Sequence, residues 1–128
     1  MSPRFLLVLS FILATAQAAA RLTEGPAKFE GEVRANEGPS WDGRDYLYFS
    51  AHDRISRRDR HGNVELVRLS TGRPNGTLID RDGRLIVCEG IGRRVTRTEK
   101  DGTITVLADR CDGMRLNSPN DLAIDPQG

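Results

Sequence analysis

The sequence predicts an all-β fold of the β-propeller type because of two observations. A layout of short strands and tight turns returns after about 40 residues, so that residues 94–107 match residues 54–67 position for position. Three segments that open with an oxygen-bearing side chain, at Glu37, Asn75 and Asn120, mark the starts of successive copies. A repeat of this length, built from strands and turns, is typical of the four-stranded blades of a propeller.

The opening segments share a second feature, an Asp five residues after the first polar residue. These aspartates are Asp42, Asp80 and Asp125. Residues that hold one register in the innermost strands of a propeller converge on its central channel, although they lie about 40 residues apart in sequence. We therefore expect the side chains of Glu37, Asn75 and Asn120 to face a common axis.

The strands that follow are predicted from composition and alternation. Residues 46–49 form a short β-rich apolar run, and residues 54–67 indicate a strand, a tight turn at Gly62 and a second strand. Glycine supplies the positive φ that such a turn often needs. The apolar run 84–88 and the hairpin 94–107 repeat this layout in the second copy.

The pattern accounts for two complete blades and the first strand of a third, about two and a quarter blades in all. This is too few to close a ring of typically four to eight blades. The pattern also stops in the middle of a copy, at Gly128. We therefore expect residues 21–128 to be the N-terminal part of a longer propeller, and not a complete small β-domain.

The first twenty residues differ from the rest of the chain. Arg4 precedes an apolar run at residues 5–16, and small residues follow at 16–20, which is the layout of a secretory signal peptide. The alternative is an uncleaved membrane anchor, but the run is shorter than the roughly 20 apolar residues that a span needs. We expect a secreted or periplasmic protein that has no membrane segment after cleavage.

The charge balance argues against a nucleic-acid-binding protein, and the cysteine content limits the kinds of site that the chain can form. The chain has 19 Lys and Arg against 18 Asp and Glu, so it lacks the basic excess of nucleic-acid-binding proteins. Cys88 lies in an apolar strand and Cys111 in a polar loop. We expect a buried thiol and a loop thiol; a disulfide is the alternative, and the spacing does not fit a zinc site.

The three opening residues offer one carboxylate and two amide carbonyls, all hard oxygen donors. Such donors suit Ca²⁺ or Mg²⁺. The alternative is that they only cap strand ends and turns, where Asn is common. His52 and His61 are interpreted as surface residues, and the sequence has no Gly-x-Ser-x-Gly elbow and no dinucleotide-binding glycine motif.

Four motifs together resemble one enzyme family. They occupy residues 37–42, 80–89, 93–97 and, most specifically, 115–121. They are similar to the gluconolactonase / senescence marker protein (regucalcin) / luciferin-regenerating-enzyme family, and most of all to its bacterial gluconolactonases. The resemblance covers about residues 30–128 and implies a six-bladed propeller with a divalent cation, commonly Ca²⁺, in its central channel.

The resemblance also implies an activity and assigns site residues. Members of the family hydrolyse sugar lactones, and some hydrolyse organophosphates. Glu37 matches a metal ligand, and Asn120 matches an Asn that contacts substrate or metal. Arg115 and Asn117 lie in the loop before Asn120 and are expected to touch substrate. The resemblance transfers no role to Asn75.

The rest of the implied site lies beyond the last residue of the sequence. A further Asn ligand, and an Asp that is both ligand and general base, belong to blades after Gly128. The implied mechanism has the cation polarise the lactone carbonyl while that Asp takes a proton from water, so we expect this fragment alone to be inactive. A non-catalytic propeller that binds a ligand on its face, and a related esterase or phosphotriesterase, stay open as alternatives.

Overall fold

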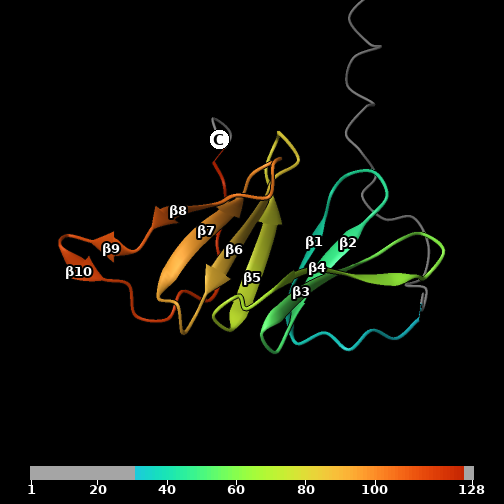
Figure 1. Ribbon diagram of the computed structural model, residues 1–128, viewed down its shortest axis with the longest axis horizontal. Coiled ribbons are helices and arrows are strands. Elements are labelled where there is room, and N and C mark those ends of the chain that lie inside the picture. Colours follow the sequence, from blue (N-terminus) through green and yellow to red (C-terminus); the bar gives the residue numbers. More distant parts are fainter. Residues whose placement is uncertain (1–30, 126–128) are drawn as a thin grey trace, which may run out of the picture. The chain divides into compact units, whose positions relative to one another are not determined.

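Residues 31–125, which the computed structural model describes, contain two four-stranded antiparallel sheets and a short hairpin (Figure 1). The first sheet consists of β1 (Glu37–Trp41), β2 (Leu47–Ala51), β3 (Arg54–Arg58) and β4 (Val64–Leu69). The second consists of β5 (Pro74–Ile79), β6 (Leu85–Glu89), β7 (Arg94–Thr98) and β8 (Ile104–Ala108). The hairpin pairs β9 (Arg110–Cys111) with β10 (Met114–Arg115).

Each sheet has the strand order of a propeller blade, because every strand pairs with its neighbours in the sequence. The all-β prediction and the strand–turn–strand layout of both copies are confirmed. The turn between β3 and β4 forms where the sequence predicts it, since the amide of Gly62 donates to the carbonyl of Asp59 at 3.2 Å. The expected signal peptide, residues 1–20, lies outside the described residues.

The two blades share irregularities as well as strands. The first pair of strands in each blade contains a β-bulge, between Glu37 and Ser40 in the first blade and between Pro74 and Thr77 in the second. In both cases two residues on the first strand lie opposite one on its partner. A bulge bends the strand and redirects the side chains next to it. The repeat therefore extends to the backbone geometry at the start of β1 and β5.

The repeated aspartates form turns. Oδ1 of Asp42 accepts three backbone amides, from residues 44–46, and Oδ1 of Asp80 accepts the amides of Asp82 and Arg84 at 3.0 and 2.8 Å. Burial alone would raise the pKa of both carboxyls, but these hydrogen bonds, together with the guanidinium of Arg84 at Asp80, lower each pKa below its ordinary value. The Asp of the repeat thus folds the turn between the first two strands of a blade.

The hydrophobic core lies between the two blades. Ile55 of the first blade packs with Leu85 and Val87 of the second, and all three are buried. Tyr48, Val67 and Ile79 surround this cluster. Burying a side chain of this size stabilises the fold by roughly 1.5–3 kcal/mol. A single blade could not bury these residues, which is why neighbouring blades stack.

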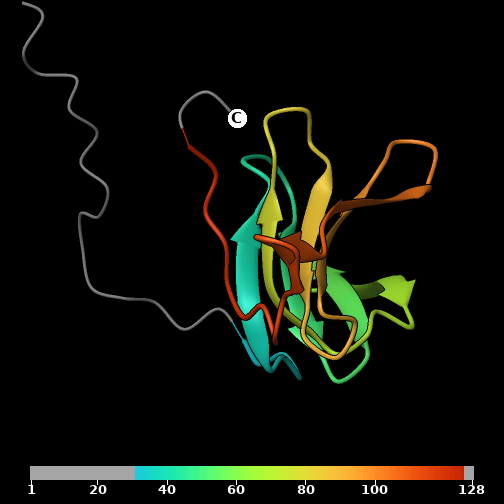
Figure 2. The ribbon, with the colours of Figure 1, turned by 90° about the vertical axis from the view of Figure 1, so that its left-hand side faces the viewer.

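The first strands of the blades also touch each other directly, and Figure 2 shows β1 and β5 side by side. The hydroxyl of Thr77 donates to the carbonyl of Gly38 at 2.5 Å. One copy further on, the amide of Gly76 donates to the carbonyl of Asn120 at 2.6 Å. The segment that opens with Asn120 therefore lies against β5, as predicted for a third copy, but residues 116–125 do not form the expected strand.

Both cysteines are free thiols, as predicted: Cys88 is buried in β6 and Cys111 is exposed in β9. Burial, followed by the negative charge of Asp121, raises the pKa of the Cys88 thiol to about 11. Among residues 31–125, the structure has no helix with the length and hydrophobicity that a membrane span requires.

Candidate functional site

The candidate site lies at the end of the two blades where β1 and β5 begin. A cavity of about 480 Å³ opens there. Glu37, Asn75 and Asn120, the three polar residues that open the copies, all line it, and so does Asn117. The prediction that these three equivalent positions face a common space is confirmed.

Glu37 presents a free carboxylate to this cavity. Its backbone is fixed, because the hydroxyl of Ser50 donates to the Glu37 carbonyl at 2.9 Å and the β-bulge follows at once. Its side chain is exposed and, within residues 31–125, has no hydrogen-bond or ion-pair partner. An unpaired carboxylate on a fixed strand end is available to bind a cation or to act on a ligand.

The donors around the cavity fit a hard divalent cation. Besides Glu37, the lining supplies the amide side chains of Asn75, Asn117 and Asn120. Carboxylate and amide oxygens are ligands that Ca²⁺ accepts. No group of three or more His, Cys, Asp or Glu that could hold a metal occurs in the described part of the chain. Among residues 31–125, the donors available to a cation here are therefore Glu37 and asparagine oxygens.

The loop that carries Asn117 and Asn120 is held in place by an arginine from another segment. Nε of Arg93, in the turn between β6 and β7, donates to the carbonyl of Leu116 at 2.6 Å. The amide of Leu116 donates in turn to the carbonyl of Asp109 at 2.9 Å. Arg93 itself lines the cavity. The guanidinium of this residue thus sets the position of the loop next to the cavity.

Arg115, which the resemblance relates to substrate, lies at the edge of this arrangement. Its side chain is exposed and donates to the carbonyl of Gly92 at 3.3 Å. It is not among the residues that line the cavity. Arg115 and Arg93 therefore link the same two segments from opposite sides, and a contact between Arg115 and substrate stays a prediction.

Gly90 allows the segments around the cavity to approach closely. A Cβ at this position would lie 3.0 Å from the Ser118 hydroxyl and 3.2 Å from Nδ2 of Asn75. These distances are shorter than ordinary van der Waals contact. The absence of a side chain at residue 90 is therefore a condition for the observed spacing of Asn75 and the loop.

Sequence reasoning assigned no role to Glu89, yet its carboxylate is fully buried and accepts three hydrogen bonds. It accepts a hydrogen bond from Arg68 of β4, one from Nε of Arg94 at 2.6 Å and one from the Thr96 hydroxyl at 2.8 Å. Arg68 also donates to the Thr96 hydroxyl at 3.1 Å. This cluster ties the first blade to the base of the turn that carries Gly90 and Arg93.

A second cavity, of about 620 Å³, adjoins the first and shares Glu37, Asn75 and Arg73 with it. His52 lines this second cavity. The backbone of His52 and of Arg73 is left-handed, with φ of 53° and 55°. Arg93, at 54°, is a third such residue. Left-handed backbone is costly for residues other than glycine and concentrates at functional sites.

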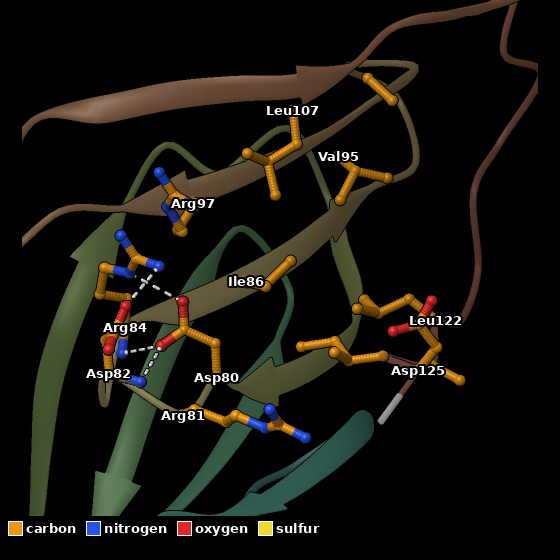
Figure 3. Close-up of a pocket in the computed structure, with 13 residues that line it drawn as sticks. Asp80, Arg81, Asp82, Arg84, Ile86, Val95, Arg97, Leu107, Leu122 and Asp125 are labelled. Atoms are coloured by element: carbon orange, nitrogen blue, oxygen red, sulfur yellow. Dashed lines mark hydrogen bonds and ion pairs between the residues drawn. The ribbon is translucent and has the colours of Figure 1, made fainter. Parts of the chain in front are cut away.

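A third cavity, of about 710 Å³, lies on the other side of the second blade, against the segment 122–125 (Figure 3). Its walls are largely apolar, with Ile86, Val95 and Leu107 on the sheet. Arg84 lines it too, and its charge is already paired with Asp80 at 2.7 Å. Residues 122–125, which form no strand, line this cavity together with the sheet.

Solved structures of other proteins resemble this fold. A gluconolactonase from Xanthomonas campestris is 38% identical with a TM-score of 0.66, over 72% of this chain and 32% of its own. A candidate gluconolactonase is 31% identical with a TM-score of 0.64, and the match covers 72% of this chain and 33% of that protein. The virginiamycin B lyase of Staphylococcus aureus, at 21% identity and a TM-score of 0.53, over 66% and 29%, shares the fold alone.

The chain thus spans about a third of the length of the gluconolactonases that it matches. Among curated proteins none is similar enough to count as a match. The family model described as the SMP-30/gluconolactonase/LRE-like region matches residues 35–128, which include every residue that lines the cavity at Glu37. The chain belongs to the SMP-30/gluconolactonase/LRE-like family.

Proposed function

We propose that the full-length protein is a metal-dependent hydrolase of sugar lactones. The observation that carries this proposal is the meeting of Glu37, Asn75, Asn117 and Asn120 at one cavity of a gluconolactonase-type fold. A binding module has no need of an unpaired carboxylate at this register. Ester hydrolysis does need charge at the reacting carbonyl, either to bind a cation or to stabilise the transition state.

In this proposal each residue has a separate task. Glu37 is a ligand of the divalent cation, expected to be Ca²⁺, which supplies the Lewis acidity that polarises a carbonyl. Asn120 and Asn117 bind the hydroxyls of the sugar ring, because amide groups both donate and accept hydrogen bonds. Arg93 holds their loop through its hydrogen bond to Leu116. None of these residues is proposed as the general base that takes a proton from water.

An assay of the full-length protein with glucono-lactone, with and without EDTA, tests this function. We expect hydrolysis that EDTA abolishes and that added Ca²⁺ restores. Activity that chelation leaves unchanged would rule out the metal-dependent mechanism. Hydrolysis of an organophosphate in place of lactones would favour the related phosphotriesterase function, and binding of lactones without turnover would favour a non-catalytic propeller.

The proposed location is outside the cytoplasm, in the periplasm or the medium. It rests on the composition of residues 1–20, with a single Arg4 before an apolar run and small residues at its end. N-terminal sequencing of the protein secreted by its native host should show a new first residue near position 21. A mature protein that still begins with Met1 would contradict the signal peptide.

A further inference from the structure

The backbone of Arg73 is left-handed, a conformation that strains any residue with a side chain. Arg73 ends the link between β4 and β5, in which Ser70, Gly72 and Arg73 all have positive φ, of 53°, 62° and 55°. Glycine adopts this backbone at little cost, whereas a side chain such as that of Arg is strained there. If only the stability of the fold mattered, glycine would be the favoured residue at position 73.

The surrounding structure holds this strained backbone from both sides. Oδ1 of Asp53 accepts the amide of Arg73 at 3.0 Å. The carbonyl of Arg73 accepts the amide of Gly90 at 3.0 Å. The main chain of Arg73 is thus fixed between the first blade and the turn that lines the cavity. The direction in which its side chain leaves the backbone is fixed with it.

The side chain of Arg73 is free, although its backbone is bound. Among the residues that the structure describes, no carboxylate or carbonyl pairs with its guanidinium. Arg93, the other left-handed arginine at the cavity, differs in this respect, because its Nε is engaged with Leu116 at 2.6 Å. Of the two cations that line the cavity, Arg73 alone is available to a ligand, as judged within residues 31–125.

Arg73 lies where the two cavities adjoin and lines both of them, so a ligand in either cavity can reach its guanidinium. The carboxylate of Asp53, which lines the second cavity, is already used by the amide of Arg73 and the hydroxyl of Thr71. Glu37 is the other acid at the shared wall, and in the proposed function it binds a cation. Within residues 31–125, a positive charge without a protein partner therefore remains beside the proposed reaction site.

We propose that Arg73 selects lactones that carry a second, anionic group, a carboxylate or a phosphate, away from the lactone ring. This inference rests on the proposed lactonase function and names its substrate class. A guanidinium presents a rigid fork of donors that matches both kinds of anion. In this proposal the left-handed backbone orients the guanidinium of Arg73 toward the ligand. The ligand contact offsets the stability that the strained backbone costs.

The experiment compares three lactones with the full-length protein: glucono-lactone, its 6-phosphate and the lactone of the corresponding dicarboxylic sugar acid. We expect kcat/KM to be highest for one of the two anionic lactones, and the one preferred shows whether the group is phosphate or carboxylate. Arg73→Gly should lower kcat/KM for that substrate about ten- to a hundredfold, the range for a hydrogen bond to a charged group. It should change kcat/KM for neutral glucono-lactone less than about threefold.

Three controls keep the test decisive. Arg73→Lys retains the charge and should keep part of the kcat/KM for the anionic lactone that Arg73→Gly loses. Arg44→Ala removes an exposed charge from the opposite end of β1 and should leave kcat/KM for all three lactones unchanged. Arg73→Gly relieves the backbone strain, so its Tm should rise or stay unchanged. Equal losses for neutral and anionic lactones, or none for either, would overturn the inference and leave the lactonase function intact. Failure to hydrolyse any lactone would overturn both.

Discussion

Arg68 of β4 donates a hydrogen bond to the carboxylate of Glu89 in β6, across the boundary between the two blades. Glu89 is fully buried and the Arg68 side chain is 11% exposed, so the pair is shielded from water. Removal of one partner from a buried pair typically costs about 3–5 kcal/mol, because the other charge is left uncompensated. The pair is therefore a point at which a single substitution can separate the blades.

The first prediction concerns stability. Glu89→Ala should lower the free energy of unfolding by about 3–5 kcal/mol, because the buried guanidinium of Arg68 loses its counter-charge and keeps only the Thr96 hydroxyl as a partner. Glu65→Ala is the matched control, since Glu65 pairs with Arg57 where both side chains are 32–52% exposed. That exposed pair is worth about 1 kcal/mol or less. Chemical denaturation of both variants measures the difference, and similar losses would show that burial of the Glu89 pair does not matter.

The second prediction concerns the free carboxylate of Glu37. Glu37→Ala in the full-length protein should reduce lactone hydrolysis by more than about a hundredfold, because a lost Lewis acid costs several kcal/mol. The Tm without added metal should change little, since Glu37 is exposed and unpaired among the described residues. Calorimetric titration with Ca²⁺ should show weaker binding. A variant with wild-type turnover would show that Glu37 is not a ligand.

The third prediction concerns the contact between β5 and the segment of Asn120. A Cβ at Gly76 would lie 2.8 Å from the Asn120 carbonyl and 2.6 Å from Oδ1 of Asp121. Gly76→Ala should therefore displace Asn120, lower stability by about 1–3 kcal/mol and reduce kcat. Gly83→Ala is the control: its φ is 77° and a Cβ there meets nothing within 4 Å. It should cost about 1–2 kcal/mol of stability and leave kcat unchanged.

The fourth prediction concerns pH. The pKa of Asp80 lies below its ordinary value of 3.8. A lowered folded-state pKa gives a stabilisation that is complete above the ordinary value and is lost as the pH falls through the folded value. The free energy of unfolding should therefore decline below about pH 4, and less so in Asp80→Asn, whose amide oxygen can still accept the turn's hydrogen bonds. Identical declines in the two proteins would exclude Asp80 as a source of the acid sensitivity.

The fifth prediction concerns the two thiols. Burial raises the pKa of Cys88 to about 11, and the thiolate is the reactive form. At pH 8 a maleimide should therefore label Cys111, which is exposed, and leave Cys88 unlabelled in the native protein. Peptide mass mapping separates the two sites. Prompt labelling of Cys88 without denaturant would mean that the segment around Asp121 moves away from β6 readily.

The strands, the turns and the repeat could be predicted because their causes are local. Alternating apolar residues, glycines at turns and an Asp at a fixed place in each copy are visible over a few neighbouring positions. The convergence of Glu37, Asn75 and Asn120 followed from the repeat, since equivalent positions of neighbouring blades must face one axis. For Asn75 the repeat predicted its place at the cavity, whereas the family resemblance assigned it no role.

The interactions that the sequence did not show join residues far apart in the chain. Glu89 stands at the end of an apolar run, and its partner Arg68 is 21 residues away on another sheet. An acid that ends an otherwise apolar strand was the available signal, because a buried charge needs a partner. The left-handed backbone of Arg73 depends on Asp53 and Gly90, which close on it only in the folded chain.

The β-bulge after Glu37 has a consequence for how this site can change in evolution or by design. Side chains of a strand alternate between its two faces, so one residue more or less between Glu37 and Ser40 would turn Glu37 away from the cavity. The same holds in the second blade for the four residues from Pro74 to Thr77. The lengths of these two segments therefore cannot vary while the site keeps its carboxylate.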